Sequence, residues 1–295
     1  MMKEEFFECY DGTKLRTYLF EAQKPKGVVL FLHGIQEYSK PYFEFAEKVN
    51  KKHFHCLLVD QRGHGRSCNK ISEIGKADYD VFSASVCDCL CISNMLKEKY
   101  QLPIYLVGFS YGSFIAQACM HKAKNISKMI LIGSGYMNQP KIRLAKIICK
   151  LGRKIKGPNA YAQSLDRSLQ KYFNRRFKPT SWITSDNDKL KILANDKLCR
   201  IPFSYGFYES LLDNLPNIAN NLKDVSKEME ILIISGEDDP VGDFGKGVKY
   251  LHQLYSNNNL NSKIIIYPKL RHNLLYEKET ADVYKDIFNF LTKKP

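Results

Sequence analysis

The stretch IYLVGFSYGSFIAQACM, residues 104–120, places a serine between two glycines where an apolar run gives way to helix-forming residues. It fits the pattern G-x-S-x-G, with Gly108 and Gly112 two residues on either side of Ser110. Small residues there prevent clashes where a strand turns sharply into a helix, and such a turn lifts the serine hydroxyl clear of the sheet. The pattern alone is common. The strand predicted before it and the helix predicted after it are what indicate a nucleophile rather than a simple tight turn.

Five other short apolar runs are similar to the one before Ser110. All six are rich in Val, Ile and Leu and do not alternate with polar residues, which is typical of strands buried on both faces of a parallel sheet. Helix-like segments separate them, which predicts an α/β fold with helices on both faces. Residues 6–22 predict an antiparallel hairpin at the sheet edge, turning near Asp11 and Gly12. The six runs span residues 27–34, 54–65, 104–110, 128–135, 229–239 and 262–272.

One long region breaks this alternation of strands and helices. Between residues 136 and 224 no strand-like run occurs, and the segments 141–155, 161–173 and 204–215 are predicted to be helical. Because strand-like runs resume afterwards, we expect a helical insertion into one domain rather than an independent second domain. The predicted organisation is a first core part at 1–135, a helical cap at 136–225 and a second core part at 226–295.

A serine hydroxyl needs a general base to become a nucleophile, and the base needs an acid that orients it. When the serine occupies a strand-to-helix turn of this kind, the acid and then the histidine follow, each after a later strand. His272 closes the last of the six runs and is the only histidine that follows its strand-like part. The acid lies in the loop that begins at residue 237. Asp239 is preferred because it precedes Pro240, which keeps its neighbour extended, and Asp238 is the alternative.

The negative oxygen of a tetrahedral intermediate needs two backbone N–H donors. One comes from the residue after the nucleophile and one from an earlier loop at the end of a strand. These residues are Tyr111 and Ile35, and Ile35 directly follows His33 and Gly34 at the end of an apolar run. The alternative for His33 and Gly34 is a turn that only ends a strand.

The chain of 295 residues has a formal net charge of +14, and most of this charge lies in the predicted cap. Residues 141–200 contain 16 Lys or Arg and 4 Asp or Glu, a net charge of +12. These basic residues either form an ordinary solvated surface or create an electrostatic field that attracts an anionic substrate or an anionic membrane. The interleaved aromatic residues and recognition motifs of nucleic-acid binders do not accompany it, so no nucleic-acid partner is expected. The oligomeric state stays open.

Nine cysteines include Cys87, Cys89 and Cys91, but no pair has the C-x-x-C spacing of zinc or redox sites. We therefore expect reduced, buried thiols and neither a metal nor a cofactor. The N-terminal residues lack the apolar core of a secretory signal, and no run approaches the roughly 18 apolar residues of a membrane span. These features predict a cytoplasmic protein, with peripheral contact of the basic cap at the inner membrane surface as a further expectation.

Five segments together resemble the monoacylglycerol lipase and lysophospholipase branch of the α/β-hydrolases, whose bacterial members are often grouped with serine aminopeptidase (S33)-like hydrolases. The segments are FLHGIQEYSKPYFEFA, VDQRGHGRS, GFSYGS, GEDDPVGDFGKGV and YPKLRHNLL. The resemblance implies the α/β-hydrolase fold and an apolar channel for an acyl chain beneath the cap. It also implies a catalytic triad of Ser110, Asp239 and His272, with Ile35 and Tyr111 as the oxyanion donors.

Two places depart from the pattern of that branch. Tyr38 stands where His is usual after Glu37, and Pro41 stands where Arg is usual before Tyr42. The resemblance implies that these positions shape the acyl or glycerol pocket. The two neighbours of Ser110 in the chain, a Phe and a Tyr, are also bulkier than the His and Met that are common there, which predicts a narrower site.

The function predicted from these features is a serine hydrolase that cleaves the carboxylic esters of lipid monoesters, either monoacylglycerols or lysophospholipids, through an acyl-enzyme. The alternatives are an aminopeptidase, a broad short-chain carboxylesterase and a non-catalytic binding protein. An aminopeptidase would need an acidic pocket for a free α-amino group, and the predicted cap has the opposite charge. Binding proteins with this fold often lack a member of the triad, and none is missing here.

Overall fold

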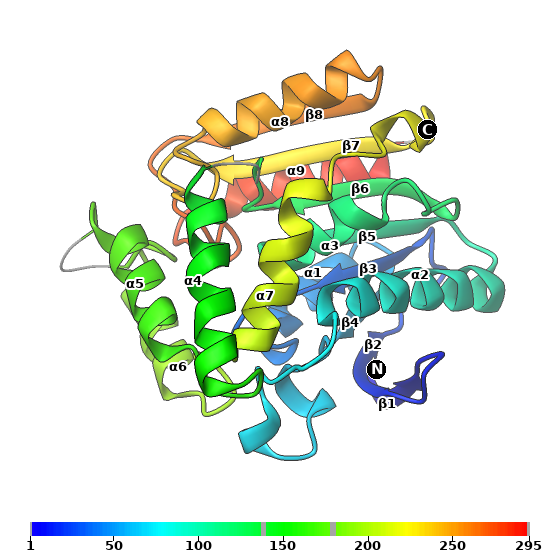
Figure 1. Cartoon of the computed structure of the whole chain (residues 1–295). Coiled ribbons are helices and arrows are strands. Elements are labelled where there is room, and N and C mark those ends of the chain that lie inside the picture. The colour runs from blue at the N-terminus through cyan, green and yellow to red at the C-terminus, as the bar shows by residue number, and fades with distance from the viewer. Residues whose placement is uncertain (1, 137–139, 178–180, 294–295) are drawn as a thin grey trace.

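A computed structural model describes residues 2–136, 140–177 and 181–293, which form an eight-stranded sheet with helices around it (Figure 1). The strand order is β1-β2-β4-β3-β5-β6-β7-β8. The pairs β1–β2 and β2–β4 are antiparallel and all the others are parallel, so the predicted mostly parallel sheet and its edge hairpin are confirmed. The strands are β1 Met2–Glu8, β2 Lys14–Phe20, β3 Val28–Leu32, β4 His55–Val59, β5 Ile104–Phe109, β6 Ile126–Ile132, β7 Glu230–Gly236 and β8 Asn261–Tyr267.

Two apolar cores, one on each face of the sheet, explain why the central strands are apolar throughout. Successive side chains of a strand point to opposite faces, and in β3 Leu30 belongs to one core while Val29 and Phe31 belong to the other. Five helices cover these faces, α2, α3 and α8 on the first and α1 and α9 on the second (Figure 1). They are α1 Phe43–Asn50, α2 Val81–Tyr100, α3 Tyr111–Cys119, α8 Lys246–Asn257 and α9 Ala281–Thr292.

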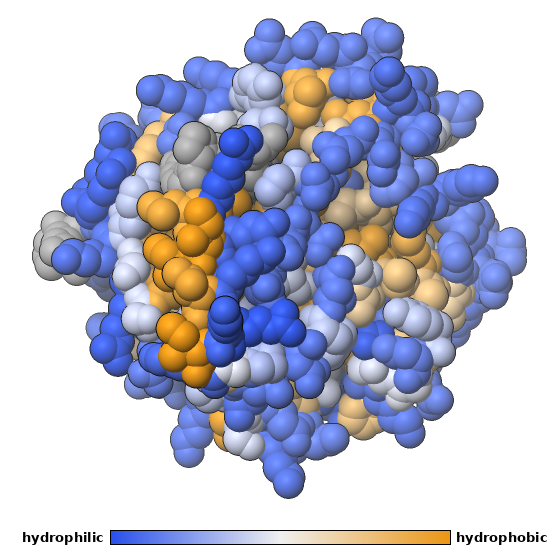
Figure 2. Space-filling model, in the orientation of Figure 1, coloured by the Kyte–Doolittle hydropathy of each residue, from blue (hydrophilic) through white to orange (hydrophobic). Residues whose placement is uncertain are grey.

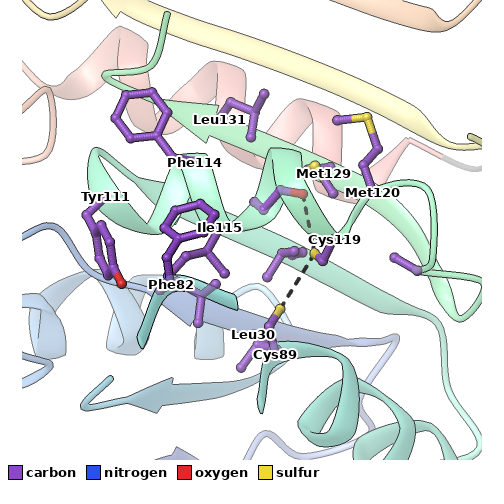
Figure 3. Packing of buried hydrophobic residues seen from close by; sticks show 14 of the residues in the cluster. Leu30, Phe82, Cys89, Tyr111, Phe114, Ile115, Cys119, Met120, Met129 and Leu131 are labelled. Atoms are coloured by element: carbon purple, nitrogen blue, oxygen red, sulfur yellow. Dashed lines mark hydrogen bonds between the residues drawn. The ribbon is translucent and has the colours of Figure 1, made fainter. Parts of the chain in front are cut away.

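The cysteines of α2 show how the helix separates core from solvent. Figure 3 shows Cys89 facing Cys119 of α3 in the first core, with their Sγ atoms 3.9 Å apart. All nine cysteines are free thiols. The expectation that they are buried is wrong for Cys87, which is exposed, because residues two positions apart in a helix lie on opposite sides of it.

A segment rich in helices lies between β6 and β7, as predicted. In Figure 1, α4, α5 and α6 lie at the end of the sheet toward which the β7 arrow points. The prediction missed α6, whose first turn is capped by the Asp186 carboxylate accepting the N–H groups of Asp188 and Lys189. Residues 137–139 and 178–180 of the predicted cap lie outside the described residues. The helices are α4 Pro140–Lys156, α5 Gln163–Asn174, α6 Asn187–Asn195 and α7 Tyr205–Asn214.

Short 3-10 helices complete the described chain, at Lys40–Tyr42, Ile71–Glu73 and Leu222–Asp224 among other places. Within the described residues, no helix combines the length and the apolar character that crossing a bilayer requires.

Candidate active site

Ser110 lies at the junction between the end of β5 and the start of α3, as the sequence predicted. Its backbone has φ +49° and ψ −114°, a strained conformation for a residue with a side chain. Two hydrogen bonds hold this turn, from the Ser110 N–H to the Ile132 carbonyl (2.9 Å) and from the Ser113 hydroxyl to the Ser110 carbonyl (2.6 Å). A Cβ at Gly112 would overlap the carbonyl group of Leu32, and one at Gly108 would overlap the Gly112 backbone. The two glycines are therefore required by the close approach of β3, β5 and α3.

The structure brings the predicted base and acid to this serine. His272 Nε2 lies 2.9 Å from the Ser110 Oγ, and His272 Nδ1 lies 3.0 Å from each carboxylate oxygen of Asp239. The Val241 N–H also donates to Asp239 Oδ1 over 2.9 Å. The backbone N–H of Asp238 instead pairs with the Leu270 carbonyl, and the side chain that meets His272 is that of Asp239.

The two predicted oxyanion donors belong to neighbouring segments. The Gly112 N–H donates to the His33 carbonyl over 3.1 Å, which joins the loop after β3 to the first turn of α3. Within residues 2–136, 140–177 and 181–293, neither the Ile35 N–H nor the Tyr111 N–H has a protein acceptor. Both groups can therefore donate to a bound ligand.

His33 is completely buried and supports the same loop. Its Nδ1 lies 2.7 Å from the Gly34 carbonyl, and its Nε2 lies 3.1 Å from the Gln61 backbone nitrogen. Burial lowers the pKa of His33 to about 4, so the ring is neutral at pH 7, with Nδ1 donating to Gly34 and Nε2 accepting from Gln61. These bonds fix the loop of His33 and Gly34, which leads into the predicted oxyanion donor Ile35.

A buried carboxyl group, Glu37, connects this loop to Asn273, the neighbour of His272 in the chain. Glu37 Oε1 accepts the Gly34 N–H over 2.5 Å, and the Tyr42 hydroxyl lies 2.8 Å from both carboxyl oxygens. The Asn273 amide in turn donates to the Tyr42 hydroxyl over 2.9 Å. Burial raises the pKa of Glu37 to about 8, although its hydrogen bonds with Tyr42 and Gly34 act in the opposite direction.

Sequence reasoning missed this network, and the resemblance implied only that the positions around Tyr38 and Tyr42 shape the acyl or glycerol pocket. Tyr42 is only 1% exposed, and its hydroxyl is hydrogen-bonded to Glu37 and Asn273. The hydroxyl of Tyr38, also buried, donates to Asp196 beyond the end of α6 over 2.8 Å. The sequence shows that Glu37 and Tyr42 are only five positions apart, which could have indicated their contact. The contact of Tyr42 with Asn273 could not be predicted in this way, because these two residues are 231 positions apart.

Aromatic rings enclose the candidate site and explain the bulky residues beside the serine. The Phe109 and Trp182 rings lie 5.0 Å and 4.8 Å from the His272 ring, measured between centroids. Tyr111 lies in the first core, where its ring packs on Phe82 (Figure 3) and on His64. Ser110 is 8% exposed and His272 3%, so both residues are largely shielded from water.

Trp182 also connects this site to the helices between β6 and β7. Its indole N–H donates to Gln170 of α5 over 2.9 Å, and its carbonyl accepts the His272 N–H over 3.3 Å. On the opposite side, the Gln36 amide next to Ile35 donates to Asp166 of α5 over 2.6 Å. The loop that contains His272 and the loop that contains Ile35 and Gln36 are thus both hydrogen-bonded to the segment that includes α5.

Comparisons with solved structures agree with this fold. A thermostable carboxyl esterase from Bacillus coagulans, solved in complex with glycerol, has a TM-score of 0.87 at 23% identity, covering 98% of this chain and 97% of that one. A soluble variant of monoglyceride lipase from Saccharomyces cerevisiae, in complex with a substrate analog, has a TM-score of 0.77 at 21% identity, covering 99% and 94%. The predicted α/β-hydrolase fold is confirmed.

Sequence comparisons lead to the same group of proteins. The monoglyceride lipase of Saccharomyces cerevisiae is 25% identical over 96% of this chain and 90% of that protein. Phospholipase YtpA of Bacillus subtilis is 24% identical over 91% and 96%. A family model described as serine aminopeptidase, S33, matches residues 23–279. Because that match spans most of the chain, the protein belongs to the serine aminopeptidase S33 family of α/β-hydrolases.

Proposed function

We propose that this protein hydrolyses carboxylic esters with Ser110 as the nucleophile. The observation that supports this most directly is the chain of hydrogen bonds from Ser110 Oγ through His272 to Asp239 at a strained turn. The Asp239 carboxylate fixes the proton on Nδ1 and leaves Nε2 to accept the proton of the serine hydroxyl.

In the first half of the proposed reaction, Ser110 Oγ bonds to the ester carbonyl carbon while its proton passes to His272 Nε2. The carbonyl π electrons move to oxygen, which accepts the N–H groups of Ile35 and Tyr111. Collapse of this intermediate breaks the ester C–O bond, and the leaving alcohol takes the proton from His272. Water then attacks the acyl-serine with His272 as base, which releases the acid and restores Ser110.

The proposed substrates are lipids with a single acyl ester, either monoacylglycerols or lysophospholipids. Two similar proteins support this class, since one is named a monoglyceride lipase and the other a phospholipase. The aromatic surroundings of His272 are also suited to an apolar acyl group.

We further propose that residues 136–225 act as a cap on a core made of residues 1–135 and 226–295. The bonds from Trp182 and Asp166 to the two catalytic loops support this division of roles. Because Ser110 is only 8% exposed, we propose that the cap shifts when an acyl chain enters.

A hydrolysis panel tests the substrate class. It compares monoacylglycerols and lysophospholipids with p-nitrophenyl acetate and aminoacyl amides, with Ser110→Ala as the control. We expect the lipid monoesters to have the highest kcat/KM and Ser110→Ala to lose on the order of 10⁴ to 10⁶ in rate. Faster turnover of the acetate would make the protein a short-chain carboxylesterase, and faster turnover of the amides an aminopeptidase. Equal activity of Ser110→Ala would contradict the mechanism.

A further inference from the structure

A row of aliphatic side chains on α4 is exposed to solvent. The spacing of the row, at i, i+3, i+4, i+7 and i+11, places all five on one side of the helix. Their exposed fractions run from 47% for Ile148 to 78% for Ile155. Figure 2 shows the row as an orange stripe at the left of the molecule, with blue residues along its right side. This α4 apolar row consists of Leu144, Ile147, Ile148, Leu151 and Ile155.

The apolar row is not the side by which α4 packs on the protein. A different side meets α7, where the Cys149 thiol donates to the Tyr205 carbonyl over 3.0 Å. One turn further along, Gly152 lies so close to the Tyr205 ring that a Cβ would overlap it. These contacts fix the rotation of α4 about its axis, so the apolar row faces outward in the folded protein.

Basic residues border the row, and α4 contains no acidic residue. Lys146 and Arg153 form ion pairs with Asp213 and Glu209 of α7. Lys150 also lies within ion-pair distance of Asp213. Among the described residues, the exposed basic side chains at positions 143, 154 and 156 have no ion-pair partner. Arg143 and Lys154 each directly precede a member of the row, Leu144 and Ile155, so their uncompensated charge lies beside the apolar row.

We propose that the α4 apolar row and its basic border dock on an anionic lipid surface. A helix with one apolar side, a Lys- and Arg-rich polar side and a low mean hydropathy is the type that lies in the plane of a membrane interface. Five aliphatic side chains would enter the acyl region while the cations meet lipid phosphates. A second copy of the chain is disfavoured, because a symmetric contact would bring two basic borders together. This surface goes beyond the proposed ester hydrolysis and does not depend on it.

The test is sedimentation of the full chain with vesicles of phosphatidylcholine alone or mixed equally with phosphatidylglycerol. We expect the wild type to partition more strongly into the anionic vesicles, and added salt to reduce that preference. Leu151→Asp should lower partitioning about tenfold or more, because it replaces a membrane-buried aliphatic group by a charge. The matched control is Ile71→Asp, which lies in the 3-10 helix Ile71–Glu73 outside the proposed cap. Ile71 and Leu151 are equally exposed, at 54% and 55%, so the two substitutions differ mainly in their place on the surface.

A charge variant separates the electrostatic part from the apolar part. Lys154→Glu should weaken binding to the anionic vesicles by about tenfold and leave binding to neutral vesicles unchanged. Thermal unfolding of each variant verifies that it is folded. Equal partitioning of the wild type into both vesicle types, or unchanged binding of Leu151→Asp, would overturn the proposal. A wild-type dimer that Leu151→Asp converts to a monomer would assign the row to a second copy instead.

Vesicle binding and catalysis are measured separately. If the wild type fails to hydrolyse any ester, the proposed function fails while the sedimentation result still decides the docking surface. If the enzyme is active but does not prefer anionic vesicles, only the docking surface is refuted.

Discussion

Replacing Glu37 by Gln should change how the stability of the protein depends on pH. In the fold its pKa is about 8, whereas its ordinary value is 4.5. Between these values the unfolded chain releases a proton that the folded protein keeps, so the free energy of unfolding falls as the pH rises. Each pH unit in that interval lowers it by about 1.4 kcal/mol, and the full difference is about 5 kcal/mol above pH 8. Glu37→Gln cannot ionise and should not lose this stability.

The assay is urea unfolding of the wild type and Glu37→Gln at several pH values from 5 to 9. Other buried groups titrate in the same range, and His33 and His64, whose pKa values are lowered by burial, make both proteins more stable as the pH rises toward neutrality. Their contribution cancels when the two proteins are compared at each pH. From pH 5 to pH 9, the free energy of unfolding of Glu37→Gln should increase by several kcal/mol relative to that of the wild type. Parallel pH profiles would refute the assignment of a raised pKa to Glu37.

Three further substitutions test the surrounding structure. Gly112→Ala should abolish most turnover and lower the thermal midpoint, because its Cβ would overlap the Leu32 carbonyl group; wild-type values for both would contradict the geometry of the turn. Asp239→Asn should keep the fold and reduce kcat on the order of 10⁴, because the amide favours the wrong histidine tautomer. Arg62→Leu leaves the Asp88 carboxylate buried and unpaired and should cost about 3 to 5 kcal/mol in urea unfolding; a loss below 1 kcal/mol would show that this ion pair is dispensable.

Local sequence patterns predicted most of the architecture, because they depend on neighbouring residues only. The apolar runs marked the central strands, and the longest of the helices that separate them is α2. The helix α6 escaped prediction, and the signal that could have found it is its N-cap, where the Asp186 carboxylate accepts the N–H groups of Asp188 and Lys189. Cys87 is exposed because of the way α2 is rotated about its axis against the core. The composition of the chain does not indicate that rotation.

In the candidate site, too, some residues could be predicted from the sequence and others could not. Ser110, His272 and Asp239 could be selected from the sequence because each follows a strand in a known order, and the structure places them within hydrogen-bonding distance. The network of Glu37, Tyr42 and Asn273 could not be selected, since its members become neighbours only when the oxyanion loop and the histidine loop pack together. Their roles in catalysis, like those of the triad, are predictions for experiment.

Labelling with a fluorophosphonate probe tests the central claim, that Ser110 is an activated nucleophile, most directly. The probe phosphonylates a serine only when a base removes its proton and donors hold the resulting oxyanion. We predict one adduct per chain by intact mass, located on the peptide that contains Ser110, and no adduct in folded Ser110→Ala. Labelling of folded Ser110→Ala to the wild-type extent, or a folded wild type that does not react, would contradict the account.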